Sequence, residues 1–327
     1  MRALQVQALG PDYAGCRLAE VDRPEPGPGE VRVRVRAASV NFPDLLMTRG
    51  EYQLKPSLPF TPGLDFSGEV DALGPGAQGW RVGDLVVGGA RLGAFAEYVV
   101  VEAAAIGRKP ERLDWGQAAA YPAAYLTAYV ALVRRAQLKP GEWVLVHGAA
   151  GGVGLACVDL AKALGARVIA ASASDAKLQV VEREYAPDAI VNTSAGFRDA
   201  VKAITGGRGA DVIYDPVGGD VFDESVRCIA FDGRLLVIGF TSGRIPTVSV
   251  NMPLIKGFSV VGVRAGEYGR QFPDKGRENS AEVARLAAEG RIRPRVHAEL
   301  PLERWREAFD LLATRQVVGK AILRPDL

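Results

Sequence analysis

Residues 147–154, HGAAGGVG, form the stretch whose composition and spacing point most directly to chemistry. The stretch follows a short apolar segment, residues 143–146, and precedes one whose apolar residues recur at helical spacing. Glycines between a strand and a helix allow a tight turn, and they let backbone N–H groups and the positive end of the helix approach a phosphate. The alternative is a tight turn without a ligand, since Ala149 replaces the first glycine of the GxGxxG spacing. We predict that the turn binds the pyrophosphate of a dinucleotide through Ala150, Gly151, Gly152, Val153 and Gly154.

The end of the next strand-like segment bears on which dinucleotide is bound. NAD-selective sites usually carry an acidic residue there, about 20 residues after the glycine loop. Here the segment ends at Ser172 and Ser174, with Lys177 one turn further along. We interpret Asp175 as the first-turn acid of a helix. Hydroxyl groups and an ammonium suit a 2′-phosphate, so we predict NADPH, with NADH as the less favoured cofactor.

Histidine and cysteine are scarce and scattered. The chain has two His and three Cys, with no short spacing between any of them. Zinc sites need clusters of these residues, so the sequence predicts chemistry without a metal. A disulfide framework is equally unexpected, which is typical of a reducing compartment. We interpret His147 and Cys157 as packing residues, and Asp215 as a carboxylate that orients a loop.

Composition limits the partners and the location. The 327 residues are 48% hydrophobic, and 40 basic against 38 acidic residues give a net charge of +2. This balance gives no electrostatic reason to expect nucleic acid or an anionic membrane as a partner. No apolar run approaches the ~18–20 residues that span a bilayer, and no signal-peptide pattern is visible. We therefore expect a cytoplasmic protein.

The elements that must position these residues fall into two classes. The first ~100 residues read as short strands; Val31, Val33 and Val35, for example, alternate with arginines that we expect on a solvated face. Asp114 and Gln117 predict a capping box for a helix that continues to Arg135. From residue 142 to about 263 strand-like and helix-like segments alternate. The fold class predicted is α/β, a doubly wound parallel sheet beside a β-rich domain.

Six further strings stand out along the chain. They are residues 37–44 (AASVNFPD), 60–70 (FTPGLDFSGEV), 121–129 (YPAAYLTAY), 214–219 (YDPVGG), 236–240 (LVIGF) and 318–323 (VGKAIL). Together with the glycine loop, these strings resemble the medium-chain dehydrogenase/reductase superfamily. The resemblance is to its zinc-lacking quinone oxidoreductase branch, which includes zeta-crystallin, and it covers nearly the whole chain. Zinc-dependent alcohol dehydrogenases have Gly-His-Glu where this chain has Gly63, Leu64 and Asp65.

The resemblance implies a domain organisation. Residues 1–122 and 265–327 would form a GroES-like catalytic domain, and residues 123–264 an inserted Rossmann domain that binds NADPH in the cleft between them. In the catalytic domain, Asn41 would lie near the nicotinamide ribose, Asp44 would steady the adjacent loop and Tyr52 would line the quinone pocket.

The resemblance also implies the remaining cofactor contacts. Lys177 would meet the 2′-phosphate, and Thr127 and the turn at 239–241 would flank the nicotinamide. Two positions depart from the branch, since Leu46 and Thr193 replace tyrosines found in some members. The full cofactor set is Asn41, Thr127, Ala150, Gly151, Gly152, Val153, Gly154, Ser172, Ser174, Lys177, Val217, Gly239, Phe240, Thr241, Val263 and Lys320.

The function that these expectations imply is an NADPH-dependent, zinc-independent quinone oxidoreductase, which transfers hydride or electrons from nicotinamide to a small-molecule quinone. An enoyl or alkenal double-bond reductase acting on an activated alkene is the first alternative. The second is an NADPH-binding sensor or crystallin-like protein with little turnover. The resemblance also implies a homodimer through Phe258–Val263, since in relatives this edge strand pairs with its symmetry mate. An edge strand this apolar would otherwise be prone to association if left unpaired.

Overall fold

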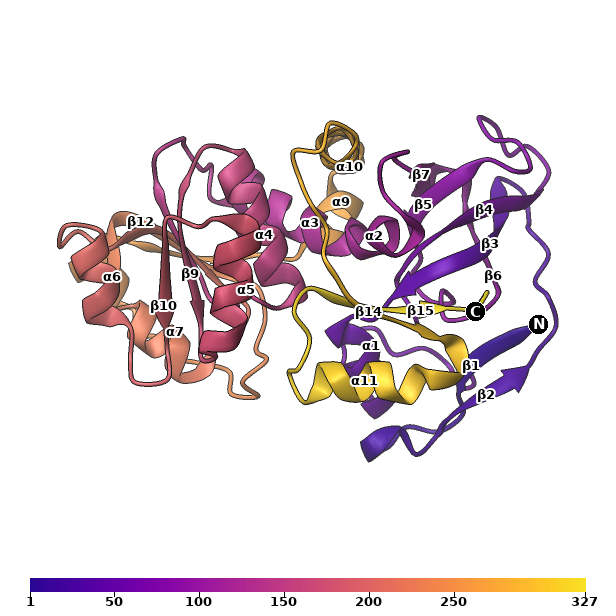
Figure 1. The fold of residues 1–327 in the computed structure, drawn as a ribbon, viewed down its shortest axis with the longest axis horizontal. Coiled ribbons are helices and arrows are strands. Elements are labelled where there is room, and N and C mark those ends of the chain that lie inside the picture. The colour runs from indigo at the N-terminus through magenta and orange to yellow at the C-terminus, as the bar shows by residue number, and fades with distance from the viewer. The chain divides into compact units, whose positions relative to one another are not determined.

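A computed structural model describes all 327 residues of the chain (Figure 1). The chain divides into two compact units. Unit 1 comprises Met1–Ala123 and Arg293–Leu327, and unit 2 comprises Ala124–Ile292. No helix in either unit has the length and apolar character needed to cross a membrane.

Unit 1 is β-rich, as predicted. A seven-stranded sheet has the order β14-β15-β3-β4-β5-β7, with β6 paired to β3, and β1 and β2 form a separate antiparallel pair. The last strand of the chain pairs antiparallel with β3, so Ile322 lies opposite Ser39, and the C-terminal segment completes the N-terminal sheet. The strands are β1 (Arg2–Val6), β2 (Cys16–Glu20), β3 (Glu30–Ser39), β4 (Asp65–Leu73), β5 (Leu85–Gly89), β6 (Tyr98–Glu102), β7 (Ile106–Arg108), β14 (Val296–Pro301) and β15 (Lys320–Arg324).

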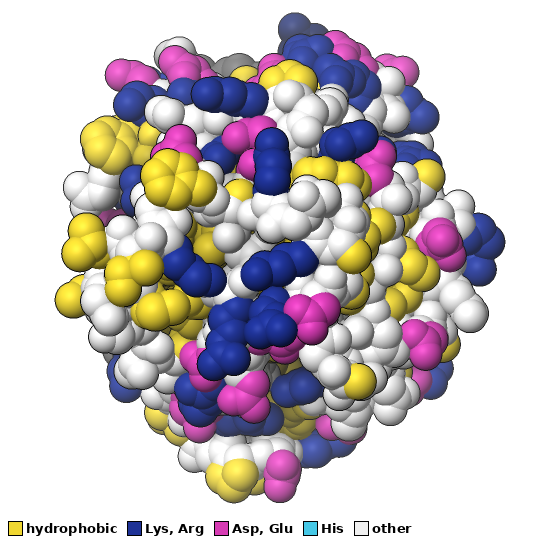
Figure 2. All heavy atoms as spheres, turned by 90° about the vertical axis from the view of Figure 1, so that its left-hand side faces the viewer, with side chains coloured by type: hydrophobic (Ala, Val, Ile, Leu, Met, Phe, Trp, Pro, Cys, Tyr) yellow, Lys and Arg dark blue, Asp and Glu magenta, His cyan; other side chains and the backbone are white.

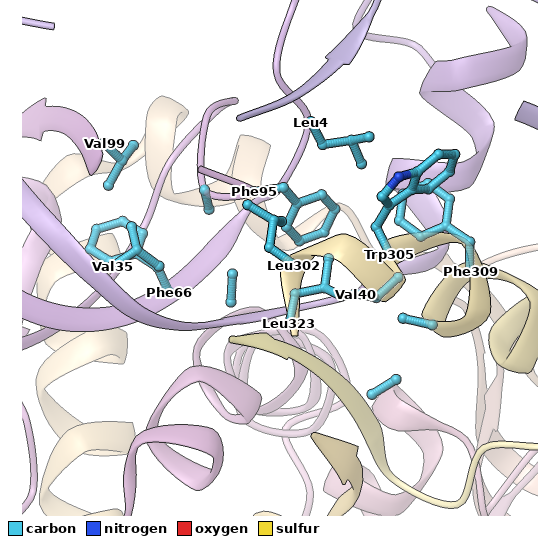
Figure 3. Close-up of a cluster of buried hydrophobic side chains, with 14 of the residues drawn as sticks. Leu4, Val35, Val40, Phe66, Phe95, Val99, Leu302, Trp305, Phe309 and Leu323 are labelled. Carbon is cyan, nitrogen blue, oxygen red and sulfur yellow. The ribbon is translucent and has the colours of Figure 1, made fainter. Parts of the chain in front are cut away.

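The core of unit 1 joins both ends of the chain. Helix α11 (Trp305–Ala313) places Trp305 and Phe309 against side chains from the N-terminal strands, as Figure 3 shows. The rings of Phe95 and Phe309 pack edge-on with centroids 5.9 Å apart. Burial of these aromatic rings, together with the pairing of β15 with β3, fixes the C-terminal segment to the sheet.

The alternation along β3 is confirmed for its valines, since Val31, Val33 and Val35 are all buried. Arg32 departs from the expected solvated face. It is buried, and its guanidinium donates to Asp71 and to Glu25. The two carboxylates make this burial possible, because a buried cation needs charged partners.

The helix predicted to run from Asp114 to Arg135 begins with the expected capping box. Gln117 N–H donates to Asp114 Oδ1 at 2.7 Å, and Asp114 N–H donates to Gln117 Oε1. Pro122 then interrupts the helix, because proline has no N–H and cannot continue the hydrogen-bond ladder. The result is three segments, α2 (Trp115–Ala120), α3 (Pro122–Tyr129) and the π-helical turn η3 (Val130–Arg135).

Unit 2 confirms the doubly wound parallel sheet. Its strands have the order β10-β9-β8-β11-β12-β13, and every pairing is parallel. Numbered along the chain this is the order 3-2-1-4-5-6 of dinucleotide-binding sheets, which reverses direction between β8 and β11. The strands are β8 (Trp143–Val146), β9 (Arg167–Ser172), β10 (Ala189–Asn192), β11 (Ala210–Asp215), β12 (Ile229–Val237) and β13 (Ser259–Gly262).

The helices that connect these strands begin at the carboxyl edge of the sheet. They are α4 (Gly152–Ala163), α5 (Asp175–Tyr185), α6 (Arg198–Ile204) and α7 (Gly219–Ser225), and α8 (Asn251–Lys256), α9 (Ala265–Gln271) and α10 (Pro273–Ala288) follow β12 and β13. Residues 265–292 group with unit 2, whereas the sequence assigned them to the β-rich domain. Arg134 on η3 accounts for the difference, because it donates to Asn279 and pairs with Glu278 on α10.

Candidate functional site

The glycine loop occupies the predicted strand–turn–helix position, between β8 and α4. Gly148 adopts a φ of +57°, and Gly151 is the N-cap of α4 with no side-chain cap. A Cβ on Gly154 would lie 2.1 Å from Gly148 O, so only glycine fits there. The first turn of α4 therefore presents uncapped N–H groups beside a loop without bulky side chains, and this cradle fits a pyrophosphate.

The other residues predicted to contact the cofactor in unit 2 follow the carboxyl ends of neighbouring strands. Because all six strands are parallel, these ends share one edge of the sheet, and the switch point of that edge lies between β8 and β11. Gly148 lies beside the loop after β11, where an added Cβ would be 3.6 Å from Val217. The residues brought to this edge are Ser172 at the end of β9 and Ser174 after it, Val217 after β11, Gly239, Phe240 and Thr241 after β12, and Val263 after β13.

Thr127 lies on α3, half-buried. The hydroxyl of Tyr125, on the same helix, donates to Asp159 Oδ2 on α4 at 2.7 Å, which fixes α3 against α4. This buried pair was missed by the sequence analysis, because Tyr125 and Asp159 belong to different helices and neither lies in a motif that suggests pairing. The predicted contact of Thr127 with nicotinamide stays a prediction.

Asp215 and His147 have the structural roles that the sequence suggested. Asp215 Oδ1 accepts the N–H groups of Val217 and Gly218 at 2.8 and 2.9 Å, so the carboxylate orients the loop after β11. His147 is buried, with Nε2 2.9 Å from Ser225 Oγ, and burial lowers its pKa to about 3. The imidazole is therefore neutral at neutral pH, and its burial, its contact with Ser225 and its edge-on packing against Phe197 agree with a packing role.

The tip of β9 carries the residues predicted to meet a 2′-phosphate. Ser174 is the N-cap of α5, and its hydroxyl accepts the N–H of Lys177 at 3.5 Å. Asp175 begins the helix, as interpreted from the sequence. Its carboxylate also accepts a hydrogen bond from Asn192 at the end of β10, a contact that no local sequence signal indicates.

A buried polar cluster in unit 1 contains three predicted site residues, Asn41, Asp44 and Lys320. It forms where three adjacent strands meet, because β15 pairs with β3 and β3 pairs with β4. Lys320 Nζ donates to Asn41 Oδ1, and Asn41 Nδ2 donates to Asp65 Oδ2 at 3.0 Å and to Ser39 O at 3.1 Å. The Asn41 amide is therefore held from both ends.

Asp44 fixes the loop that enters helix α1 (Phe42–Arg49). Its two carboxylate oxygens accept Asn41 N–H at 2.8 Å and Gly63 N–H at 3.1 Å. The carboxylate is fully buried. Burial, opposed by these N–H groups, raises the pKa of Asp44 to about 7.

Asp65 is the member of the cluster that the sequence analysis did not assign to the site. Its carboxylate is buried and accepts hydrogen bonds from Ser39 Oγ, Asn41 Nδ2 and Ala123 N–H. Burial raises the pKa of Asp65, and the Lys320 ammonium opposes this rise. Burial likewise lowers the pKa of Lys320, and both carboxylates oppose that change. The signal that could have identified Asp65 was its position in the string Gly63, Leu64, Asp65.

Tyr52 lies apart from this cluster. Its ring is half-buried against the core of unit 1. It shares no hydrogen bond with Asn41, Asp44 or Lys320. Its predicted contact with a quinone stays a prediction.

No group of three or more His, Cys, Asp or Glu side chains that could hold a metal ion occurs in the chain.

Comparison with known proteins places this geometry in a family. Residues 27–111 match the alcohol dehydrogenase GroES-like domain, and residues 152–284 match the zinc-binding dehydrogenase family. The chain is 40% identical to quinone oxidoreductase-like protein 2 of Mus musculus over 87% of its own length and 81% of that protein.

Two solved structures share the whole fold. Mycobacterial Rv1454c, solved in complex with NADPH, has a TM-score of 0.91 and 30% identity, covering 99% of this chain and 100% of that one. The CurK enoyl reductase has a TM-score of 0.90 and 25% identity, covering 99% and 98%. The chain is therefore an oxidoreductase of the medium-chain dehydrogenase/reductase superfamily, and belongs with its quinone oxidoreductase-like members.

Proposed function

We propose that this protein is an NADPH-dependent quinone reductase that works without zinc. The observation that carries the proposal is the uncapped glycine turn before α4, at the switch point of a 3-2-1-4-5-6 parallel sheet. The 39–40% identity to quinone oxidoreductase-like proteins and the NADPH complex of a structural neighbour support the cofactor and the substrate class. NADPH, when bound, supplies the hydride that reduces the substrate.

The residues of unit 2 hold the cofactor in this proposal. The N–H groups of residues 152–154, in the uncapped first turn of α4, would bind the pyrophosphate, whereas Gly151 N–H is donated to Gly148 O at 2.8 Å within the loop. The turns at Val217 and 239–241 lie at the same edge of the sheet. Ser172, Ser174 and Lys177 offer hydroxyl groups and a cation at the tip of β9, which is the donor set that a 2′-phosphate requires.

In this proposal the residues of the buried cluster in unit 1 orient the Asn41 side chain and the loop that enters α1, and they do not donate protons to the substrate. The Asn41 amide is fixed by Lys320, Asp65 and Ser39, and Asp44 holds the α1 entrance against Gly63. Both carboxylates accept hydrogen bonds from their neighbours inside the protein. Because water can protonate the oxygen of a quinone after reduction, the reaction needs no strong general acid, which agrees with a cluster whose task is positioning.

The lack of a zinc requirement is supported by the chemistry of one segment. Leu64 stands where zinc-dependent relatives have histidine, and the Asp65 carboxylate is already bonded to Ser39, Asn41 and Ala123. A cytoplasmic location is also part of the proposal, supported by three cysteines that are all free thiols.

Steady-state oxidation of NADPH, followed with 1,4-naphthoquinone and with an α,β-unsaturated aldehyde, tests the proposal. Faster turnover of the quinone is expected. Preference for the aldehyde would favour an enoyl or alkenal reductase, a reading supported by the likeness to the CurK enoyl reductase. Tight NADPH binding without oxidation of any acceptor would favour a binding protein with little turnover.

We also propose a homodimer through the β13 edge. Val260 on this strand is 38% exposed, and the nearby α8 segment exposes Val250 and Leu254 by 87% and 83%. Figure 2 shows one face of the molecule, on which apolar side chains are exposed among charged and polar ones. Such an edge favours pairing with another strand.

Sedimentation equilibrium tests the dimer directly. Val260→Asp is expected to convert a dimer into a monomer, because it buries a charge in the proposed interface. Val82→Asp, at a valine of unit 1 that is 65% exposed, is the matched control and leaves the mass unchanged. A monomer before any substitution, or a dimer that survives Val260→Asp, contradicts the proposal.

A further inference from the structure

The end of β9 holds one acidic side chain close to the residues proposed to meet the 2′-phosphate. The parallel strands β9 and β10 end at paired residues, with Ser172 opposite Asn192. Three residues beyond Ser172, Asp175 begins helix α5 directly after its N-cap, Ser174. A carboxylate free to reach the adenosine ribose would accept its 2′-hydroxyl and repel a 2′-phosphate.

The Asp175 carboxylate is held by a neighbouring side chain. Asn192 Nδ2 donates to Asp175 Oδ1 at 2.6 Å. The Asn192 amide is itself oriented, because its Oδ1 accepts the N–H of Ser194 at 2.9 Å. The amide therefore presents its NH₂ group to Asp175, which only a hydrogen-bond acceptor can use.

The order of the strands shows on which side of β9 the hydrogen bond between Asn192 and Asp175 lies. β10 is the edge strand on one side of β9, and β8 with its glycine loop is on the other. A carboxylate bonded to the last residue of β10 is drawn to the side of β9 that lies away from the loop. The polar side chains at the tip of β9 are then Ser172, Ser174 and Lys177, with the exposed Asp175 carboxylate bonded toward β10.

We propose that Asn192 is a specificity-determining residue, which favours NADPH over NADH by holding the Asp175 carboxylate toward β10. The inference rests on the proposed cofactor site at the carboxyl edge of unit 2. Asn192 acts through Asp175 and is a positioning residue rather than a ligand of the cofactor.

Equilibrium binding of NADPH and of NADH, measured by nucleotide fluorescence on the purified full chain, tests the inference. Asn192→Ala frees the carboxylate and is expected to lower the ratio of NADPH to NADH affinity by about tenfold, equivalent to ~1.4 kcal/mol. Asn192→Ser is expected to give the same shift, because its hydroxyl can still accept from Ser194 but is too short to hold Asp175. In an Asp175→Asn background, Asn192→Ala is expected to leave the ratio unchanged.

Two results would overturn the inference. One is an Asn192→Ala shift that is equal for both cofactors, and the other is a shift that persists in the Asp175→Asn background. Asp199→Asn, which removes a first-turn acid from helix α6, is the matched control and is expected to leave the ratio within about twofold. Failure of the unaltered protein to bind either nucleotide would refute the proposed function itself, a result distinct from unaltered selectivity.

Discussion

Replacing Lys320 by methionine isolates the contribution of the buried cation to unit 1. The Lys320 ammonium donates to Asn41, and Asp65 and Asp44 are its charged neighbours. With both carboxylates ionised the cluster carries a net charge of −1, and Lys320→Met changes this to −2 in a site closed to solvent. Removing one partner from a buried ionic group destabilises a protein by about 3–5 kcal/mol.

The expected loss can be measured by thermal and urea denaturation. For a domain of this size about 3–5 kcal/mol corresponds to a decrease of about 6–20 °C in the Tm. The loss is expected to be smaller at pH 5 than at pH 8, because protonation of Asp44 and Asp65 removes the uncompensated charge. The double variant Lys320→Met, Asp65→Asn is the control, and it is expected to recover part of the stability because it removes one of the two carboxylates.

An unchanged Tm for Lys320→Met at pH 8 would refute this reasoning. It would mean that water reaches the cluster and solvates the carboxylates, so that the ammonium is not needed. A loss that stays the same from pH 5 to pH 8 would also refute it, because the effect would then come from packing of the lysine stem.

Three further predictions concern single groups. Burial raises the pKa of Asp44 from 3.8 to about 7, so the folded state binds more protons than the unfolded state between these values, and stability is expected to fall as the pH rises from 4 to 8. Asp44→Asn should make the free energy of unfolding, measured by urea titration, less dependent on pH. If the pH dependence is unaltered in this variant, groups other than Asp44 cause it. Lys177→Ala should raise the KM for NADPH by at least about tenfold while leaving that for NADH within about twofold, because in the proposed site the cation meets the 2′-phosphate, a group that NADH lacks. Equal effects on the two KM values would contradict this proposed role of Lys177. Dialysis against EDTA should leave quinone reduction unchanged, and an activity that is lost and then restored by zinc would contradict the metal-free proposal.

Much of unit 2 could be predicted because its signals are local. The alternation of strand and helix from residue 142, and the glycines at 148, 151 and 154, lie within short stretches whose spacing directly reflects backbone geometry. The capping box at Asp114 and Gln117 is local in the same sense. The structure confirms the fold class for this reason, and it brings the predicted loop residues to one edge because parallel strands share their carboxyl ends.

The tertiary structure alone decided which distant side chains meet. Lys320 reaches Asn41 across 279 residues of sequence, and Arg134 joins η3 to α10. Neither contact produces a periodic pattern in the sequence, because long-range pairing depends on strand register and helix packing rather than on neighbouring residues. The sequence therefore determined most of the elements and the glycine turn between β8 and α4. The enclosure of Asp44, Asp65 and Lys320 in one buried cluster arises only when β15, β3 and β4 lie side by side, and the hydrogen bond from Asn192 to Asp175 only when β9 and β10 do.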